Sequence, residues 1–292
     1  MALPLTLRRA LRPLHPARLR FKRLLSTLNL DPGGLGARVE PPGSRDYIIC
    51  GCPRTGTSLL AAVLHQPPHV ITVTEPWDGL RLPPADLFLS LRAELQARRR
   101  LSRGTLDVVE LVRTGSVKRT REELVDAPVD IVGDWQLGVK WPCFYRYLEL
   151  LRDTRFLVCL RDPFEVIRSF ERSGGSLYDG LDYSVPFNAS MNASLRGAAP
   201  TRELRRIRMY DYVHERIIPH LNRPNVFVVR YERWFRDPDA LIRELGEFLG
   251  APLGRGYPRI RKPESRRTTV GAQADLIRRE CRTAAVLGYA LE

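Results

Sequence analysis

The stretch from residue 47 to residue 60 constrains this chain more than any other. It reads Tyr-Ile-Ile-Cys-Gly-Cys-Pro-Arg-Thr-Gly-Thr-Ser-Leu-Leu, an apolar run followed by a loop with Gly51 and Gly56 and by hydroxyl residues that open a helix. Glycines let backbone amides turn into such a loop, and the helix N-terminus adds its partial positive charge. The segment therefore predicts a cradle for a phosphate-like anion between a strand and a helix.

The pattern that follows predicts the fold class. Apolar, strand-like runs alternate with amphipathic helical stretches, which is typical of an α/β fold with a doubly wound, mostly parallel sheet. We expect strands at Tyr47 to Cys50, Val70 to Thr74, Arg155 to Leu160 and Asn225 to Arg230. We expect helices at Thr57 to Leu64, Ala85 to Arg99, Phe144 to Leu151, Pro163 to Arg172, Leu204 to His220, Pro238 to Leu249 and Ala272 to Leu287.

The chain divides into a basic N-terminal tail and linker, residues 1–45, and one domain, residues 46–292. Residues 1–30 contain no Asp or Glu and many Arg, a composition that suits peripheral contact with an anionic membrane, an organelle-targeting peptide or a disordered tail. Within the domain we expect a helical insertion between Pro83 and Asp130. Residues 175–200, with scattered Gly, Ser, Asn and Pro, predict a long loop or lid.

Charge and cysteine usage narrow the function classes. The formal net charge of +14 predicts attraction to nucleotides, nucleic acid or an acidic membrane. Aromatic residues do not interleave the basic ones as stacking platforms would, so nucleic acid is not the expected partner. The five cysteines lack disulfide or zinc spacing, which indicates reduced core residues and a cytoplasmic location, with peripheral membrane association as the variant.

The loop ends differently from a nucleoside triphosphate site. It lacks the Gly-Lys-Ser/Thr ending whose Lys reaches the terminal phosphates, and Arg54 stands inside it, in Pro-Arg-Thr-Gly-Thr-Ser. This sequence resembles the 5′-phosphosulfate loop of the sulfotransferases that use PAPS (3′-phosphoadenosine 5′-phosphosulfate), and comes closest to the tyrosylprotein and bacterial carbohydrate enzymes. The resemblance implies a P-loop-like sulfotransferase fold in which Arg54, Thr55, Gly56, Thr57 and Ser58 bind the donor.

Three further segments match the same family. Arg161, in Leu-Arg-Asp-Pro after an apolar run, and Ser169 on the following helix are both suited to grip a phosphate, and the resemblance assigns them to the donor's 3′-phosphate. Tyr231, in a strand that ends in Tyr-Glu, would approach the adenine. In the basic stretch 259–267, the resemblance implies Lys262 as a donor contact and Ser265 as a contributor to catalysis.

Sulfuryl transfer to a hydroxyl needs a base and positive charge near the leaving oxygen. Glu75 follows the strand at Val70 to Thr74, at the edge where parallel sheets place their sites, and the resemblance also makes it the general base. Lys140 matches a family lysine that is aimed at the sulfate, and Arg54 would share that task. No carboxylate cluster suited to a metal accompanies the loop, so no metal is expected, and the five histidines are expected to be structural.

The expected function is thus transfer of a sulfuryl group from PAPS to a hydroxyl-bearing acceptor such as a sugar, glycolipid, peptide or phenol. Three alternatives stay open: a P-loop phosphoryl transferase, a basic nucleic-acid-binding protein, and a catalytically inactive homologue that binds PAPS.

Overall fold

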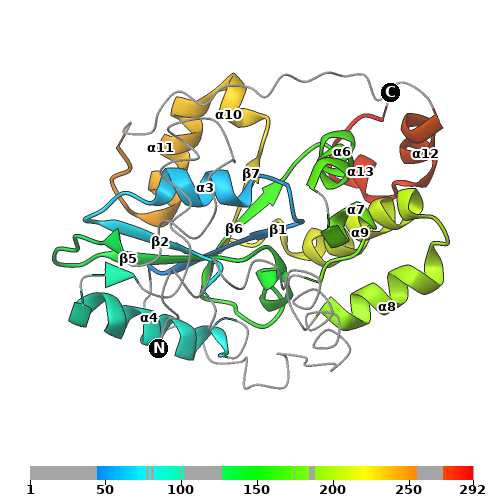
Figure 1. Cartoon of the computed structure of the whole chain (residues 1–292). Coiled ribbons are helices and arrows are strands. Elements are labelled where there is room, and N and C mark those ends of the chain that lie inside the picture. Colours follow the sequence, from blue (N-terminus) through cyan, green and yellow to red (C-terminus); the bar gives the residue numbers. More distant parts are fainter. Residues whose placement is uncertain are drawn as a thin grey trace.

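A five-stranded parallel sheet forms the centre of the protein (Figure 1). The computed structural model describes residues 45–76, 79, 82–98, 100–101, 127–173, 175–183, 188–254 and 272–291. The strands are β1 (Tyr47–Gly51), β2 (Val70–Thr74), β5 (Gln136–Lys140), β6 (Arg155–Leu160) and β7 (Val226–Arg230), in the order β2-β5-β1-β6-β7. All four neighbouring pairs are parallel, which confirms the predicted fold class. A separate two-stranded ladder joins β3 (Arg100–Leu101) to β4 (Ala127–Pro128).

Helices cover both faces of the sheet. Alternate residues of β1 belong to two separate apolar clusters, with Ile49 in one and Ile48 in the other. The helices α3 (Thr57–Leu64), α10 (Arg233–Arg236) and α11 (Pro238–Leu249) pack on the Ile49 face and lie above the sheet in Figure 1. The opposite face is covered by α4 (Pro84–Arg98), the 3₁₀ helix η4 (Pro142–Tyr147), α6 (Pro163–Ser173) and α9 (Arg202–Ile217). Burial on both faces explains why these strands are continuous apolar runs.

The strand β5 was not predicted, although it lies between β1 and β2. Its central residue Gly138 pairs with Tyr47 of β1. A Cβ at Gly138 would lie 2.2 Å from the Tyr47 ring, which crosses β5 so that its hydroxyl lies 2.6 Å from Oγ1 of Thr72 on β2. Glycine lowers strand propensity and also permits this close approach.

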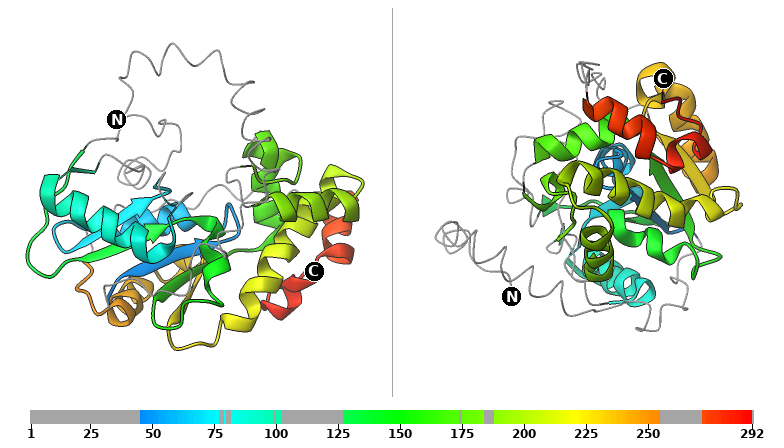
Figure 2. Two further views of the ribbon diagram at one scale, coloured as in Figure 1. Left: turned by 90° about the horizontal axis from the view of Figure 1, so that it is seen from below. Right: turned by 90° about the vertical axis from the view of Figure 1, so that its right-hand side faces the viewer.

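Other boundaries differ from expectation in the second half of the chain. The predicted loop at 175–200 was wrong, because this region contains α7 (Gly175–Tyr178) and α8 (Ala189–Ala198). The single helix predicted to end the chain is two, α12 (Ala272–Glu280) and α13 (Thr283–Val286), and the last turn expected of α9 is the 3₁₀ helix η6 (Ile218–His220). Figure 2 shows α6 to α9 gathered at one end of the sheet, with α12 and α13 beside α9.

Several features of the sequence lie in buried or undescribed parts of the chain. All five cysteines are free and buried. The Asn-x-Ser residues Asn188 and Asn192 are each 1% exposed and hydrogen-bond to Asp182, so neither can carry a glycan in this fold. No helix among the described residues is long and apolar enough to cross a bilayer. The predicted tail and linker, apart from Arg45, and part of the predicted insertion, residues 102–126, lie outside the described residues.

Candidate active site

The loop after β1 has the shape of an anion cradle. Gly51, Arg54 and Gly56 have φ angles of 147°, 74° and 100°. The amide and the hydroxyl of Thr55 both donate to the carbonyl of Cys52, at 3.2 and 2.7 Å, so Thr55 is placed to hold the shape of the loop. The helix α3 begins at Thr57 with no side chain capping its N-terminus. Its first amides have no intrahelical partner, which makes this helix end suited to an anion.

Tyr231 closes one side of this loop. A Cβ at Gly56 would lie 2.5 Å from Cδ2 of Tyr231, so the ring occupies the space that any larger residue at position 56 would need. The guanidinium carbon of Arg161 lies 4.0 Å from the centre of the same ring, a cation–π contact. The structure therefore brings the predicted adenine residue, the loop and the predicted 3′-phosphate residue into one cluster.

Arg54, Arg161 and Ser169 connect the two predicted phosphate sites. Nε of Arg54 donates to Oγ of Ser169 at 2.8 Å, and Nη1 of Arg161 donates to the Arg54 carbonyl at 3.1 Å. The Arg161 side chain is 12% exposed, and its Nε is a buried donor without a hydrogen-bond partner among the described residues. A buried guanidinium N–H of this kind suits an anionic oxygen.

Three residues that the sequence analysis missed hold Arg161. Glu165 accepts from Nη2 of Arg161 at 3.2 Å, and its position four residues after Arg161 was the signal that could have found it. Tyr210 on α9 donates its hydroxyl to the Arg161 carbonyl at 3.1 Å. Glu232, the second residue of the Tyr-Glu pair, accepts from the amide of Asp162 at 2.9 Å.

Glu75 and Lys140 form an ion pair at the same edge of the sheet. Oε1 of Glu75 accepts from Nζ of Lys140 at 2.6 Å, with side-chain exposures of 16% and 2%. Sheet pairing sets this arrangement, since Thr74 lies opposite Lys140 and the Glu75 amide donates to the Lys140 carbonyl at 2.8 Å. On the other side Lys140 pairs with Ile49 of β1, one strand away from the loop.

Backbone strain marks two of these positions. Arg54, with a φ angle of 74°, and Glu75, with 49°, are the non-glycine residues with positive φ in the described part of the chain. Left-handed backbone costs an L-residue about 1–2 kcal/mol and tends to persist where function requires it. The sequence had assigned both residues to catalysis.

The remaining candidates are two residues of the basic stretch 259–267, a metal site and the histidines. Lys262 and Ser265 are outside the described residues. Within the described ranges, no group of three or more His, Cys, Asp or Glu is arranged to hold a metal. His214 is fully buried, with its Nδ1 2.7 Å from the Tyr210 carbonyl, and burial lowers its pKa to about 4. It is a structural histidine, as expected.

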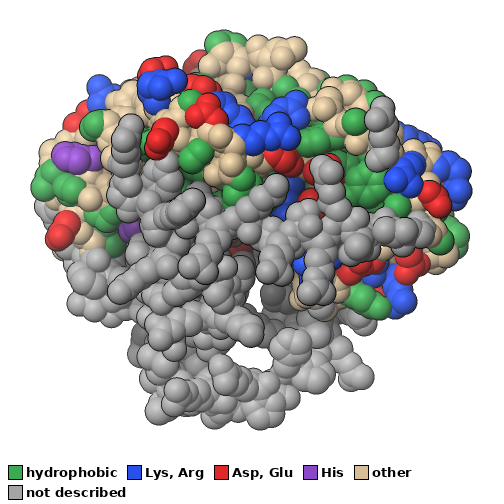
Figure 3. Space-filling view, turned by 90° about the horizontal axis from the view of Figure 1, so that it is seen from above, with side chains coloured by type: hydrophobic (Ala, Val, Ile, Leu, Met, Phe, Trp, Pro, Cys, Tyr) green, Lys and Arg blue, Asp and Glu red, His purple; other side chains and the backbone are tan. Residues whose placement is uncertain are grey.

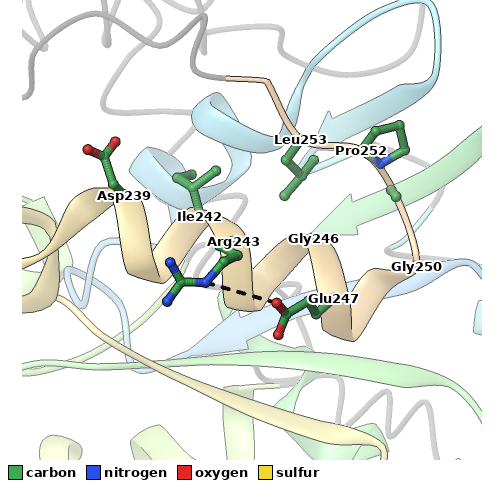
Figure 4. Close-up of a pocket in the computed structure, with 9 residues that line it drawn as sticks. Asp239, Ile242, Arg243, Gly246, Glu247, Gly250, Pro252 and Leu253 are labelled. Carbon is green, nitrogen blue, oxygen red and sulfur yellow. Dashed lines mark ion pairs between the residues drawn. The ribbon is translucent and has the colours of Figure 1, made fainter.

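A hollow of about 580 Å³ lies between α11, from Asp239 to Glu247, and residues 250–253 (Figure 4). Side chains at the starts of β5 and β6, Gln136 and Arg155, both donate to the Leu249 carbonyl, so the C-terminal end of α11 is near the amino edge of the sheet. The residues that line the hollow include neither the loop after β1 nor Glu75.

Basic and acidic side chains are interspersed on the face seen from above (Figure 3). Ion pairs on α10 and α11 follow this pattern, with Arg233 2.6 Å from Glu244 and Arg243 4.0 Å from Glu247. The visible, described part of this face does not carry the continuous basic stripe that a nucleic-acid-binding surface needs.

Comparisons with known proteins agree with the sequence resemblance. Structures of low similarity include a sulfotransferase from Alicyclobacillus acidocaldarius (18% identity, 86% of this chain and 97% of that one, TM-score 0.43). They also include the sulfotransferase domain of the Synechococcus PCC 7002 olefin synthase (17%, 87% and 86%, 0.41) and mouse sulfotransferase SULT7A1 complexed with PAP (16%, 80% and 66%, 0.39). No curated protein sequence matches. The family model described as the sulfotransferase family matches residues 47–255, and the chain belongs to this family.

Proposed function

We propose that this sulfotransferase uses PAPS as its donor and transfers the sulfuryl group to an acceptor hydroxyl. One observation carries the proposal: the hydrogen bonds of Arg54 and Arg161 join the loop after β1 to Ser169 in a single constellation. Such a constellation offers one anion site at the N-terminus of α3 and a second at Arg161 and Ser169. PAPS carries anionic groups at its 5′ and 3′ positions, whereas AMP and ATP lack the 3′-phosphate.

The reaction is an in-line exchange at sulfur. The acceptor oxygen forms a bond to sulfur while the bond from sulfur to the bridging oxygen of the 5′-phosphate breaks, and adenosine 3′,5′-bisphosphate (PAP) leaves. Glu75 takes the acceptor proton as general base, and Lys140 and Arg54 stabilise the negative charge on the transferring oxygens and the leaving group. The ion pair couples the base to the cation next to it.

The acceptor enters from the side of α7, α8 and α9. A hollow of about 360 Å³ is lined there by Asp179, Leu181, Tyr183, Arg196 and Arg205. The start of α8 lies beside η4, the helix that follows the Lys140 strand, since Nη2 of Arg146 is 3.5 Å from Oδ1 of Asn188. The mixture of a tyrosine, a leucine, an aspartate and two arginines suits an amphipathic hydroxyl compound.

Calorimetric titration tests the donor. PAP should bind at least tenfold more tightly than AMP or ATP, because about 1.5–3 kcal/mol is typical of hydrogen bonds to a charged group. Equal affinities would refute PAPS as the donor.

Turnover tests the base. The acceptor is first identified by incubating labelled PAPS with extracts of the source organism and analysing the products by mass spectrometry. Glu75→Gln should then abolish transfer while PAP binding stays within about threefold. Glu247→Gln, at a residue 71% exposed on α11, is the matched control and should leave both unchanged. Transfer at the wild-type rate by Glu75→Gln would place the base elsewhere.

A further inference from the structure

The last part of the described chain lies beyond the segment that matches the family, which ends at residue 255. Its helices α12 and α13 pack against α9 (Figure 2). Residues 281–289, which we name the C-terminal clamp, also reach the ends of β6 and β7, where the Arg161 site lies. The inference below concerns that site, and it rests on the proposed PAPS donor.

One anchor of the clamp is on α9. Asp211, which is 2% exposed, accepts from the amides of Arg282 and Thr283 at 3.1 and 3.0 Å and from the Thr283 hydroxyl at 2.9 Å. The preceding residue, Tyr210, donates to the Arg161 carbonyl. Adjacent residues of one helix therefore fix the clamp and the Arg161 backbone.

The second anchor is at the end of β7. Nη2 of Arg230 donates to the Leu287 carbonyl at 2.7 Å, and its guanidinium carbon lies 5.2 Å from the centre of the Tyr289 ring. The Tyr289 hydroxyl donates to Oε2 of Glu232 at 3.3 Å. Burial raises the pKa of Tyr289, so the hydroxyl keeps the proton that it donates.

Glu232 links Tyr289 to the donor site. Its Oε1 accepts from the amide of Asp162 at 2.9 Å, the residue directly after Arg161. The two carboxylate oxygens thus connect the clamp to the turn between β6 and α6. Among the described residues, the Arg161 guanidinium contacts the Arg54 carbonyl, Glu165 and the Tyr231 ring. Its position above the sheet therefore depends on how this turn is held.

We propose that Glu232 and Tyr289 are positioning residues for Arg161 and so determine the selectivity for a 3′-phosphorylated nucleotide. Bidentate contacts of a guanidinium with a phosphate require a fixed orientation. When the Glu232 bridge is lost, the turn at Asp162 loses one of the contacts that hold it, and the 3′-phosphate contact weakens while the 5′ cradle on α3 is unaffected.

The test compares PAP and AMP binding by calorimetry in four variants. Tyr289→Phe removes only the hydroxyl and should weaken PAP binding about fivefold. Glu232→Leu removes both acceptors and should weaken it about tenfold or more. Glu232→Gln removes the same charge but keeps an oxygen for the Asp162 amide, and it should bind PAP within about twofold of wild type. Tyr178→Phe is the matched control, since the Tyr178 ring also packs against arginines, at 4.8 Å.

AMP separates positioning from a general loss of structure. AMP affinity should stay within about twofold in all variants, because AMP has no 3′-phosphate. A parallel loss of PAP and AMP binding, or unchanged PAP binding in both Tyr289→Phe and Glu232→Leu, overturns the inference alone. A wild-type protein that binds PAP no better than AMP contradicts the proposed donor and the inference together.

Discussion

The buried ion pair between Glu75 and Lys140 allows a quantitative test of how this site is held together. Its atoms are 2.6 Å apart, and the lysine is 2% exposed. At an effective dielectric constant of about 20, two unit charges at this distance attract by about 6 kcal/mol, and desolvation of the two ions offsets several kcal/mol of that. Loss of one partner leaves the other charge buried and should lower the free energy of unfolding by about 3 kcal/mol. This is the lower end of the usual range, because Glu75 is partly exposed.

A double-mutant cycle measures this coupling. Glu75→Gln and Lys140→Met should each lower the free energy of unfolding by about 3 kcal/mol, and the double variant by about 4 kcal/mol, which gives a coupling energy of about 2 kcal/mol. The assay is urea denaturation followed by tryptophan fluorescence.

The exposed pair of Arg243 and Glu247, 68% and 71% exposed at 4.0 Å, provides the control. The same cycle there should give a coupling energy below about 0.5 kcal/mol. Additive effects at Glu75 and Lys140, or coupling no larger than in the control pair, would refute the claim that burial makes this pair a structural unit.

Three other changes test the loop and the core. Gly56→Ala should abolish PAP binding in calorimetry, since the added methyl meets the Tyr231 ring at 2.5 Å and position 56 has φ 100°; retained binding would contradict this. Arg54→Gly should be more stable in urea than Arg54→Ala by about 1 kcal/mol because only glycine tolerates its positive φ freely, and the reverse order would argue against strain. Burial lowers the pKa of His214 to about 4, below its unfolded value of about 6.5. The contribution of His214 to the free energy of unfolding is therefore fully present above pH 6.5. It is lost as the pH falls toward 4, by about 1.4 kcal/mol per pH unit. His214→Gln should flatten the stability profile in this interval, and an unchanged slope would exclude His214 as its source.

The sequence predicted four of the five strands of the parallel sheet because each is a continuous apolar run with a clear turn at its end. It missed β5, where Gly138 interrupts the run to make room for Tyr47. That reason lies in the neighbouring strand and could not be read locally. The helix α8 was missed because Asn188 and Asn192 suggest a loop, whereas both amides are used by the buried Asp182.

The candidate site, like the fold, was predicted in part from the sequence. Arg54, Arg161, Ser169 and Tyr231 stand in compact motifs, and the structure brings all four together. The contact between Glu75 and Lys140 depends on sheet order, so the sequence proposed the two residues but not their pairing. Tyr289 offered no signal, since its link to Asp162 through Glu232 exists only after α13 docks.

The order of the strands also bears on how the protein folds. In the parallel sheet β5 lies between β1 and β2, although it follows both in the sequence. Each of the four strand pairings in this sheet joins segments that are far apart in the sequence, and none is closed by a local turn. Folding of such a sheet is slow, because loop closure precedes any stabilising contact, and unpaired strand edges stay exposed meanwhile. A nucleotide that contacts the ends of β1, β6 and β7 binds only when all three are in register. Donor nucleotide added during refolding should therefore raise the yield of native protein.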